Sequence, residues 1–321
     1  NINITNNNKN NNNNNINKIY ICNRILPEGN QKGFFILYNN NTFQFNAITN
    51  NYKNKTFLKN RKINFSKIKQ LVKYRYQFRH KALNIFIYKS QRSKLFDFEN
   101  EEDFNNCLDF LKLNCKNLEK NYEDIEYYKN LWKFGTLSNY DYLIYINTIA
   151  SRSFNDLSQY PIFPWVISNY NNEENFDLKN PKNYRDLSKP IGALSQYKLE
   201  NFLQNFYKNK KISVSEKNFG KNQGWLYPEF YSTPGVVVYY LVRTHPLFLM
   251  KFNNGSLGNY ENLFNSIKEN WDFLMSINND VRELTPEFFG GKGDFLVNFN
   301  NLNFEENNFT GKNIENVKKD I

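Results

Sequence analysis

Apolar and polar positions alternate along the first third of the chain. The alternating apolar positions are Phe43, Phe45, Leu83, Ile85, Ile87, Leu95, Phe96 and Phe98, with polar stretches between the runs. A period of two is typical of antiparallel strands that bury one face. Residues 16–116 are therefore predicted to form several antiparallel strands.

A helical pattern closes this part of the chain. Asn100 is the predicted N-cap and Asp103 stands three positions after it. Side-chain oxygens at these positions satisfy main-chain N–H groups that a helix leaves unpaired at its start. The apolar residues that follow at helical spacing are Phe104, Leu108, Leu111 and Cys115. Several strands followed by one helix are the outline of a pleckstrin-homology (PH) fold.

The second half is predicted to be mostly helical. Ser138 and Asp141 can cap a helix that starts at about Asn139. Its apolar positions are Leu143, Ile146 and Ala150. Two later stripes predict core-facing helices, the second with Asn259 as a candidate cap. They consist of Leu199, Phe202, Leu203 and Phe206, and of Leu263, Phe264, Ile267, Trp271 and Leu274.

An aromatic-rich segment between these helices cannot be helical. From Asp156 to Trp165 it contains two prolines, each of which pushes the residue before it, Tyr160 or Phe163, out of helical geometry. The large rings favour burial of this stretch. We expect it to run as an extended segment through the core of a helical domain.

Length and charge indicate two domains. The 321 residues exceed the usual size of one domain, and the net charge of +11 is concentrated early: Lys53 to Lys94 holds fourteen Lys or Arg and no Asp or Glu. The predicted parts are an Asn-rich disordered segment 1–17, a first domain 18–116, a linker 117–128 and a second domain 129–321.

The second domain resembles the BEACH family through six blocks in the right order. Family-like residues are Trp132, Gly135, Ser138, Asn139, Tyr142, Leu143, Asn147–Ala150, Arg152, Ser153, Asn155, Asp156, Leu157–Trp165, Arg185, Leu187, Lys189, Pro190, Gly192, Ala193, Tyr240–Arg243 and Glu283–Phe289. Ser151 stands where the family usually has Gly, and Pro228, Glu229 and Phe230 replace a Gly, Thr and His. The family's later blocks do not follow Phe309, so we expect a C-terminally incomplete fragment of a larger protein with WD repeats.

The first domain is similar to the PH-like module that precedes BEACH domains. The resemblance lies in Lys32–Ile36, Thr42–Phe45, Arg75–Arg79 and Ala82–Phe86. Together the two resemblances imply an α+β fold, in which a PH-like antiparallel β-sandwich with a C-terminal helix precedes a mostly α-helical BEACH domain with extended irregular core segments. Arg75 and Arg79 are candidate residues of a PH–BEACH interface. The candidate BEACH motif residues are Trp132, Asn147, Arg152, Asn155, Asp156, Tyr160, Pro161, Phe163, Pro164, Trp165, Lys189 and Pro190.

Candidate catalytic groups are scarce. His80 and His245 are the two histidines, and neither lies near a nucleophile motif. The run Gly290–Gly293 lacks the spacing of a phosphate-binding loop and is predicted to be a turn. Cys22, Cys107 and Cys115 lack metal-ligand spacing and are expected to be free buried thiols. No enzyme activity, cofactor or metal is predicted.

The resemblance implies a non-enzymatic scaffold in vesicle and membrane trafficking, lysosome-related or endosomal, that acts through a combined PH–BEACH surface. The expected partners are proteins of the trafficking machinery and, weakly, an anionic membrane surface. The expected location is cytoplasmic and peripheral on endomembranes. The alternative is binding of phosphoinositide lipid or nucleic acid by the basic region 53–94, where Tyr74, Tyr76 and Phe78 interleave with cations. Nucleic acid is the less favoured ligand, because half of these rings should be core.

Overall fold

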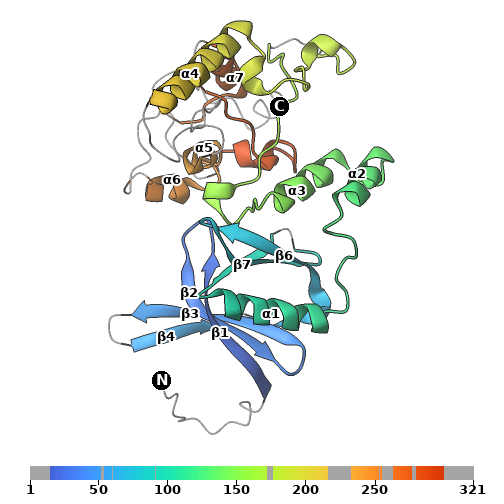
Figure 1. The fold of residues 1–321 in the computed structure, drawn as a ribbon, viewed down its shortest axis with the longest axis vertical. Coiled ribbons are helices and arrows are strands. Elements are labelled where there is room, and N and C mark those ends of the chain that lie inside the picture. The colour runs from blue at the N-terminus through green and yellow to red at the C-terminus, as the bar shows by residue number, and fades with distance from the viewer. Residues whose placement is uncertain are drawn as a thin grey trace. The chain divides into compact units, whose positions relative to one another are not determined.

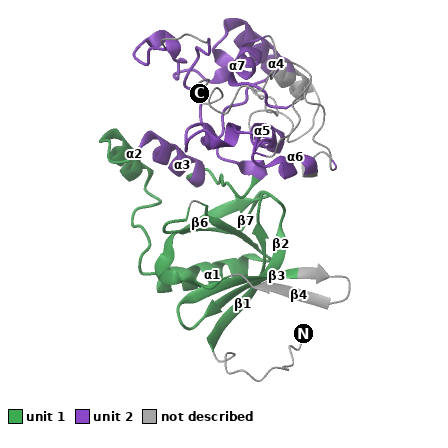
Figure 2. Cartoon of the chain, turned by 180° about the vertical axis from the view of Figure 1, so that it is seen from behind, with its two compact units in different colours: residues 1–137, 149–156 green, residues 138–148, 157–321 purple. Residues whose placement is uncertain are grey.

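The computed structural model describes residues 15–51, 54–59, 61–90, 92–171, 176–215, 233–252, 254, 263–276 and 280–299. Backbone contacts divide the chain into two compact units, which Figure 2 colours separately. Unit 1 comprises residues 1–137 and 149–156, and unit 2 comprises residues 138–148 and 157–321. Unit 1 holds the strands, and unit 2 holds most of the helices.

Unit 1 contains one antiparallel sheet, drawn in blue to cyan in Figure 1. Its strands within the described residues are β1 (Ile16–Ile25), β2 (Gln31–Tyr38), β3 (Thr42–Asn51), β4 (Asn54–Lys59), β5 (Ile63–Asn64), β6 (Ile68–Tyr76), β7 (Arg79–Ile87) and β8 (Lys94–Phe98). The order across the sheet is β4-β3-β2-β1-β8-β7-β6, and β5 pairs with β3. One end of this order, β6, is therefore an edge strand.

The alternating residues of the sheet form the core of unit 1, as their period of two predicts. Phe35 and Phe96 are almost fully buried, and their ring centroids lie 5.0 Å apart in an edge-on arrangement. Helix α1 (Glu101–Asn114) closes this core with Phe104, Leu108 and Leu111. The predicted cap is present, because the Asp103 N–H donates to Asn100 Oδ1 at 2.8 Å. The PH-like fold is confirmed.

A short connection and a second helix complete the first part of unit 1. The main-chain N–H of Glu119 donates to the carbonyl of Lys69 at 3.0 Å, which ties the connection to the edge strand β6. Asp124 then caps α2 (Ile125–Lys133), because its Oδ1 accepts from the Tyr127 N–H at 3.0 Å.

Unit 2 is mostly helical, with long irregular segments between its helices. Its described helices are α3 (Asn139–Ile149, of which Ile149 falls in unit 1), α4 (Gln196–Ser215), α5 (Pro234–Tyr240), α6 (Pro246–Phe252) and α7 (Ile267–Met275). None of the helices in the described ranges is long and apolar enough to cross a membrane. A helical unit that follows a PH-like sheet confirms the predicted α+β class.

Helix α3 begins where the sequence predicts it, but its buried face is different. The Asp141 N–H donates to Ser138 Oγ at 3.0 Å, which confirms the cap. The predicted apolar positions Ile146 and Ala150 are exposed, whereas Tyr145, Asn147 and Thr148 are buried. Asn147 and Thr148 can be buried because their side chains donate to the main-chain carbonyls of Leu143 and Ile144.

The predicted start of α7 was also wrong. Ser266 is its cap and accepts from the Glu269 N–H at 3.0 Å, so Leu263 and Phe264 precede the helix. A serine followed three residues later by a glutamate is the stronger start signal. Asn259 lies outside the described residues, as do most of the Asn-rich segment 1–17, Lys53, the substitutions at 228–230 and everything after Phe299.

The aromatic segment is extended and buried, as predicted. After a short 3-10 turn at Leu157–Gln159 the chain runs extended, and Phe163 forms an antiparallel bridge with Leu284. Tyr160, Phe163 and Trp165 are each at most 2% exposed.

Candidate protein-interaction site

Residues 149–156, called the strap here, lie in the BEACH-like stretch of the sequence but pack with the sheet of unit 1. The Tyr74 hydroxyl on β6 donates to Asp156 Oδ2 at 3.2 Å. The Asn155 amide donates to the carbonyl and to Oγ of Ser93, each at 3.1 Å. Asn155 and Asp156 are 5% and 4% exposed, so these bonds are shielded from water.

Ser151 fixes the strap to the edge of the sheet. Its Oγ accepts from the main-chain N–H of Arg75 at 3.4 Å. Its φ of 57° lies in the left-handed region, where glycine has no steric penalty. This backbone conformation accounts for the family's preference for Gly at this position. Ser151 adopts this strained conformation, and its hydroxyl forms a hydrogen bond that Gly could not form.

The two predicted interface arginines differ in their surroundings. The Arg75 guanidinium lies over the Phe78 ring, 5.8 Å from its centroid, while its backbone binds the strap. The Arg79 guanidinium donates to Gln77 Oε1 at 2.9 Å and approaches Asp97 at 4.0 Å. Burial raises the pKa of Asp97, although Lys81 and Arg79 act in the opposite direction.

In unit 2, Asn147 and Tyr160 hold the extended segment in place. The Asn147 amide donates to the carbonyl of Ile162 at 3.0 Å, and its Oδ1 accepts from the Ile162 N–H at 3.0 Å. This pair of bonds replaces the partner that a neighbouring strand would supply. The Tyr160 hydroxyl donates to Glu287 Oε1 at 2.6 Å.

A buried ion pair holds the other end of that segment. The Arg185 Nη1 lies 2.8 Å from Glu283 Oε2, and both side chains are at most 9% exposed. The same carboxylate accepts from the Trp165 N–H at 2.9 Å, and the Trp165 indole donates to the carbonyl of Arg282. Burial raises the pKa of Glu283, whereas Arg185 and the Trp165 N–H lower it.

The remaining motif residues differ in burial and in position. Pro161 is buried, while Arg152 and Pro164 are half-buried. The carbonyl of Lys189 accepts from Arg185 Nη2 at 3.2 Å, and Pro190 precedes a short 3-10 helix. Trp132, near the end of α2, is 38% exposed.

Two buried cations were not among the candidate site residues predicted from the sequence, although Arg243 lies in a family-like block. Lys198, on the inner face of α4, donates to the carbonyls of Leu274 and Asp280, and burial lowers its pKa. Arg243 donates to the carbonyls of Phe264 and Asn265, and burial lowers its pKa to about 10. The stripe of α4 contained the signal for Lys198, since it lies one turn before Phe202 on the same face.

The predicted thiols and turn are as expected. The free Cys22, Cys107 and Cys115 are buried, and burial raises the pKa of Cys115 to about 12. Gly291 and Gly293 have positive φ within a turn after the short 3-10 helix at 286–288. His80 is exposed on β7, and the His245 ring stacks on Phe248 at 4.6 Å. Among the described residues, no His, Cys, Asp or Glu are grouped for metal binding.

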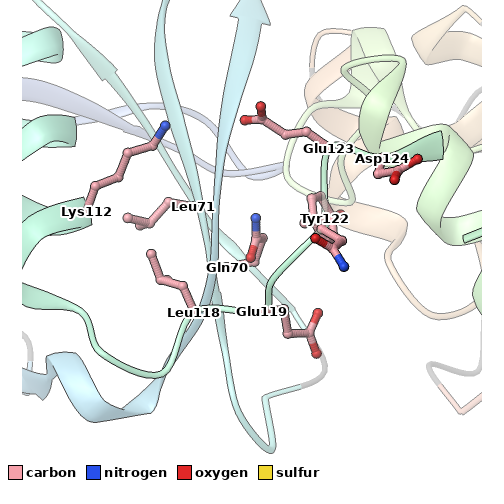
Figure 3. A pocket seen from close by; sticks show the side chains of 9 residues that line it. Gln70, Leu71, Lys112, Leu118, Glu119, Tyr122, Glu123 and Asp124 are labelled. Atoms are coloured by element: carbon pink, nitrogen blue, oxygen red, sulfur yellow. The ribbon is translucent and has the colours of Figure 1, made fainter. Parts of the chain in front are cut away.

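A shallow hollow of about 650 Å³ lies at the β6 edge of unit 1, shown in Figure 3. Gln70 and Leu71 of β6, Lys112 of α1, and residues 118–119 and 121–124 line it. Two of its three acidic side chains have structural roles: Glu119 pairs with Lys69 at 3.3 Å, and Asp124 caps α2.

Comparison with known proteins matches both parts of the chain. A model of the PH domain associated with Beige/BEACH matches residues 22–112, and a Beige/BEACH domain model matches residues 130–319. The strap thus belongs to the matched BEACH range. Its hydrogen-bond partners, Tyr74 on β6 and Ser93, belong to the matched PH range.

Two curated relatives are similar over more than half of the chain. Beige protein homolog 1 of Saccharomyces cerevisiae is 40% identical over 190 residues, which are 58% of this chain and 8% of the yeast protein. BEACH domain-containing protein lvsD of Dictyostelium discoideum is 36% identical over 188 residues, 58% of this chain and 6% of that protein. The aligned part thus spans less than a tenth of either relative. The domain match and the fold together show that the chain belongs to the Beige/BEACH-domain family.

Proposed function

We propose that this chain is a non-enzymatic adaptor of vesicle and membrane trafficking, in lysosome-related or endosomal traffic. It acts through one protein-interaction surface to which the PH-like and BEACH parts both contribute. The strap is the observation that supports this proposal most directly, because a stretch of the BEACH range completes the PH-like unit through shielded hydrogen bonds. In this proposal the BEACH range supplies residues that the PH-like unit needs for its own packing, so the two ranges act together in one adaptor.

The use of the buried ionisable groups supports the absence of catalysis in this proposal. Arg185 and Glu283 pair with each other, and Lys198 and Arg243 donate to main-chain carbonyls. A general base or nucleophile needs a reactive atom that is free to contact substrate, whereas these groups bond to each other or to main-chain carbonyls. Arg185 and Glu283, which lie in family-like blocks, therefore have a structural role in this proposal.

The proposed partners are proteins of the trafficking machinery, and the proposed location is cytoplasmic and peripheral on endomembranes, within a larger protein that carries WD repeats. A second candidate activity is weak, salt-sensitive association with anionic membranes. It is favoured by exposed cations on β6 and β7, such as Lys73, Arg75 and Arg79. Nucleic acid is less favoured, since Tyr74 and Tyr76 are 1% and 8% exposed and cannot stack on bases. In this proposal Arg75 and Arg79 remain candidate interface residues.

Affinity purification from cells tests the adaptor proposal with three versions of the full chain. These are the native chain, a strap variant that combines Asn155→Ala with Asp156→Ala, and a control that combines His80→Gln with His245→Gln. We expect the native chain and the control to capture the same trafficking proteins, and the strap variant to lose them while its circular dichroism is unchanged.

Two results would overturn the proposal. Undiminished capture by the strap variant would mean that the shared strap plays no part in the surface. Loss of complementation by the histidine control, with its fold and its captured proteins intact, would point to chemistry instead of adaptor binding.

A further inference from the structure

The β6–β7 hairpin has an unusual tip. Tyr76 and Arg79 face each other, so Gln77 and Phe78 form a two-residue turn, with φ of 46° and 64°. Two positive φ values are typical of a type I′ turn, which favours Asn-Gly. A bulky residue in this region is an outlier that costs conformational energy. The fold therefore keeps a phenylalanine where local preference disfavours one.

The Phe78 ring is not buried in return for this strain. It is 87% exposed, whereas the neighbouring rings of Tyr74 and Tyr76 are buried. The Arg75 guanidinium lies over this ring, 5.8 Å from its centroid, but this exposed contact does not bury the ring in a core. Strained residues that persist without a packing reason cluster at binding sites.

The charge around the tip is positive. Residues 72–84 contain Lys73, Arg75, Arg79 and Lys81 and no acidic residue. From the neighbouring strand β8, Asp97 faces Arg79 and Lys81 at 4.0 Å, but its side chain is only 4% exposed. The Lys81 ammonium is half-buried and donates to the carbonyl of Glu99 at 2.8 Å. The cations presented to solvent are thus Lys73, Arg75 and Arg79.

We propose that this hairpin tip is a membrane-insertion element that places the Phe78 ring in the interfacial region of an anionic lipid bilayer. The inference rests on the membrane association proposed above and assigns it to one site. An exposed aromatic ring at a hairpin tip can enter the interfacial region of a bilayer, where aromatic side chains are enriched. The cations on the flanking strands can then bind lipid phosphates. Single-stranded nucleic acid would need a series of exposed rings, and here only one of the three neighbouring rings is exposed.

Co-sedimentation with vesicles tests this assignment in the full chain. The vesicles contain phosphatidylcholine alone or with about 30% phosphatidylserine, at low and physiological salt. The variants are Phe78→Ser, a Gln77→Asn/Phe78→Gly turn and the matched control Phe134→Ser, since Phe134 in unit 1 is 84% exposed. Loss of one inserted aromatic ring is expected to weaken binding to anionic vesicles about tenfold.

The two tip variants separate insertion from folding. The Asn-Gly turn is expected to keep or raise the melting temperature and still to lose about tenfold in binding, because it suits type I′ geometry but has no ring. Phe134→Ser is expected to bind as the native chain does. A fluorophore on Phe78→Cys is expected to shift to the blue on anionic vesicles, and one on Phe134→Cys is not; the native thiols are buried and should not react.

Any outcome that differs from these expectations would contradict one stated claim. Native-like binding by both tip variants would overturn the insertion site and leave membrane association standing. No binding of the native chain to anionic vesicles at low salt would overturn both. Displacement of the protein from vesicles by single-stranded RNA, with loss of RNA binding in Phe78→Ser, would reassign the tip to nucleic acid.

Discussion

At the scale of single residues, the buried polar side chains of the BEACH motif bond to the main chain or to other side chains of the protein. Asn147 and Glu283 each fix one end of the extended segment, and Asn155 and Asp156 fix the strap. These polar groups are buried because their hydrogen bonds compensate for lost hydration. Their loss should therefore lower the free energy of unfolding.

Replacement of Glu283 by Ala should strongly destabilise unit 2. It leaves Arg185 as an unpaired buried cation, which costs about 3–5 kcal/mol. The matched control is Asp272→Ala, which breaks the exposed Lys268–Asp272 pair and should cost less than about 1 kcal/mol. Urea denaturation of the full chain measures both. Equal effects would show that the Arg185–Glu283 pair is not buried as described.

Ser151 gives a test of backbone strain in the strap. Both Ser151→Gly and Ser151→Ala remove the bond to Arg75, but only Gly is free of steric strain at a φ of 57°. The Gly variant should therefore be more stable than the Ala variant by about 1–2 kcal/mol, the reverse of the usual order in regular structure. Thermal denaturation compares the two, and an Ala variant as stable as the Gly variant would contradict the left-handed conformation.

At the scale of elements, local signals were predictable and distant partners were not. The caps of α1 and α3 depend on residues three positions apart, so the sequence contains the whole signal. The buried face of α3 depends on tertiary contacts, which the spacing of its apolar residues does not encode. The start of α7 depends on competition between caps, and its prediction was wrong. The strap's bonds join residues 62 to 82 positions apart, which no local pattern encodes.

Local patterns and the family resemblance agreed on the main elements. The prolines and rings of residues 156–165 predicted the extended buried segment, the strand–helix order of residues 16–116 predicted the PH-like module, and both are present. Arg243 lies in a family-like block and Lys198 in an apolar stripe, but neither pattern encodes the main-chain carbonyls that these cations bind.

Gly33 tests the packing of β2 against β3. A Cβ at this position would lie 2.3 Å from the carbonyl oxygen of Asn46 and 2.6 Å from the Phe45 ring. Since a backbone atom cannot move aside easily, Gly33→Ala should destabilise unit 1 by about 1–3 kcal/mol or more. At Gly135 no atom lies within 4 Å of such a Cβ, so Gly135→Ala should show only the penalty of its positive φ. Unchanged stability of Gly33→Ala would refute the close approach.

At the scale of the whole molecule, sequence boundaries and structural boundaries differ. The BEACH match spans residues 130–319, yet residues 149–156 within it pack with the PH-like sheet. Cutting the chain between the two matched ranges would remove a part of unit 1's own packing. This sharing of residues is the physical basis of our proposal that the two parts act as one adaptor.

The most direct test of the shared strap is a double-mutant cycle on the Tyr74–Asp156 bond in the full chain, with the free energy of unfolding of unit 1 measured in urea. Tyr74→Phe and Asp156→Ala should be non-additive by about 0.5–3 kcal/mol, the range for residues in contact. Tyr74→Phe and Asp272→Ala, which share no bond, should be additive. Additivity of the Tyr74 and Asp156 changes within about 0.3 kcal/mol would contradict the account, since the strap would then not be part of the PH-like unit.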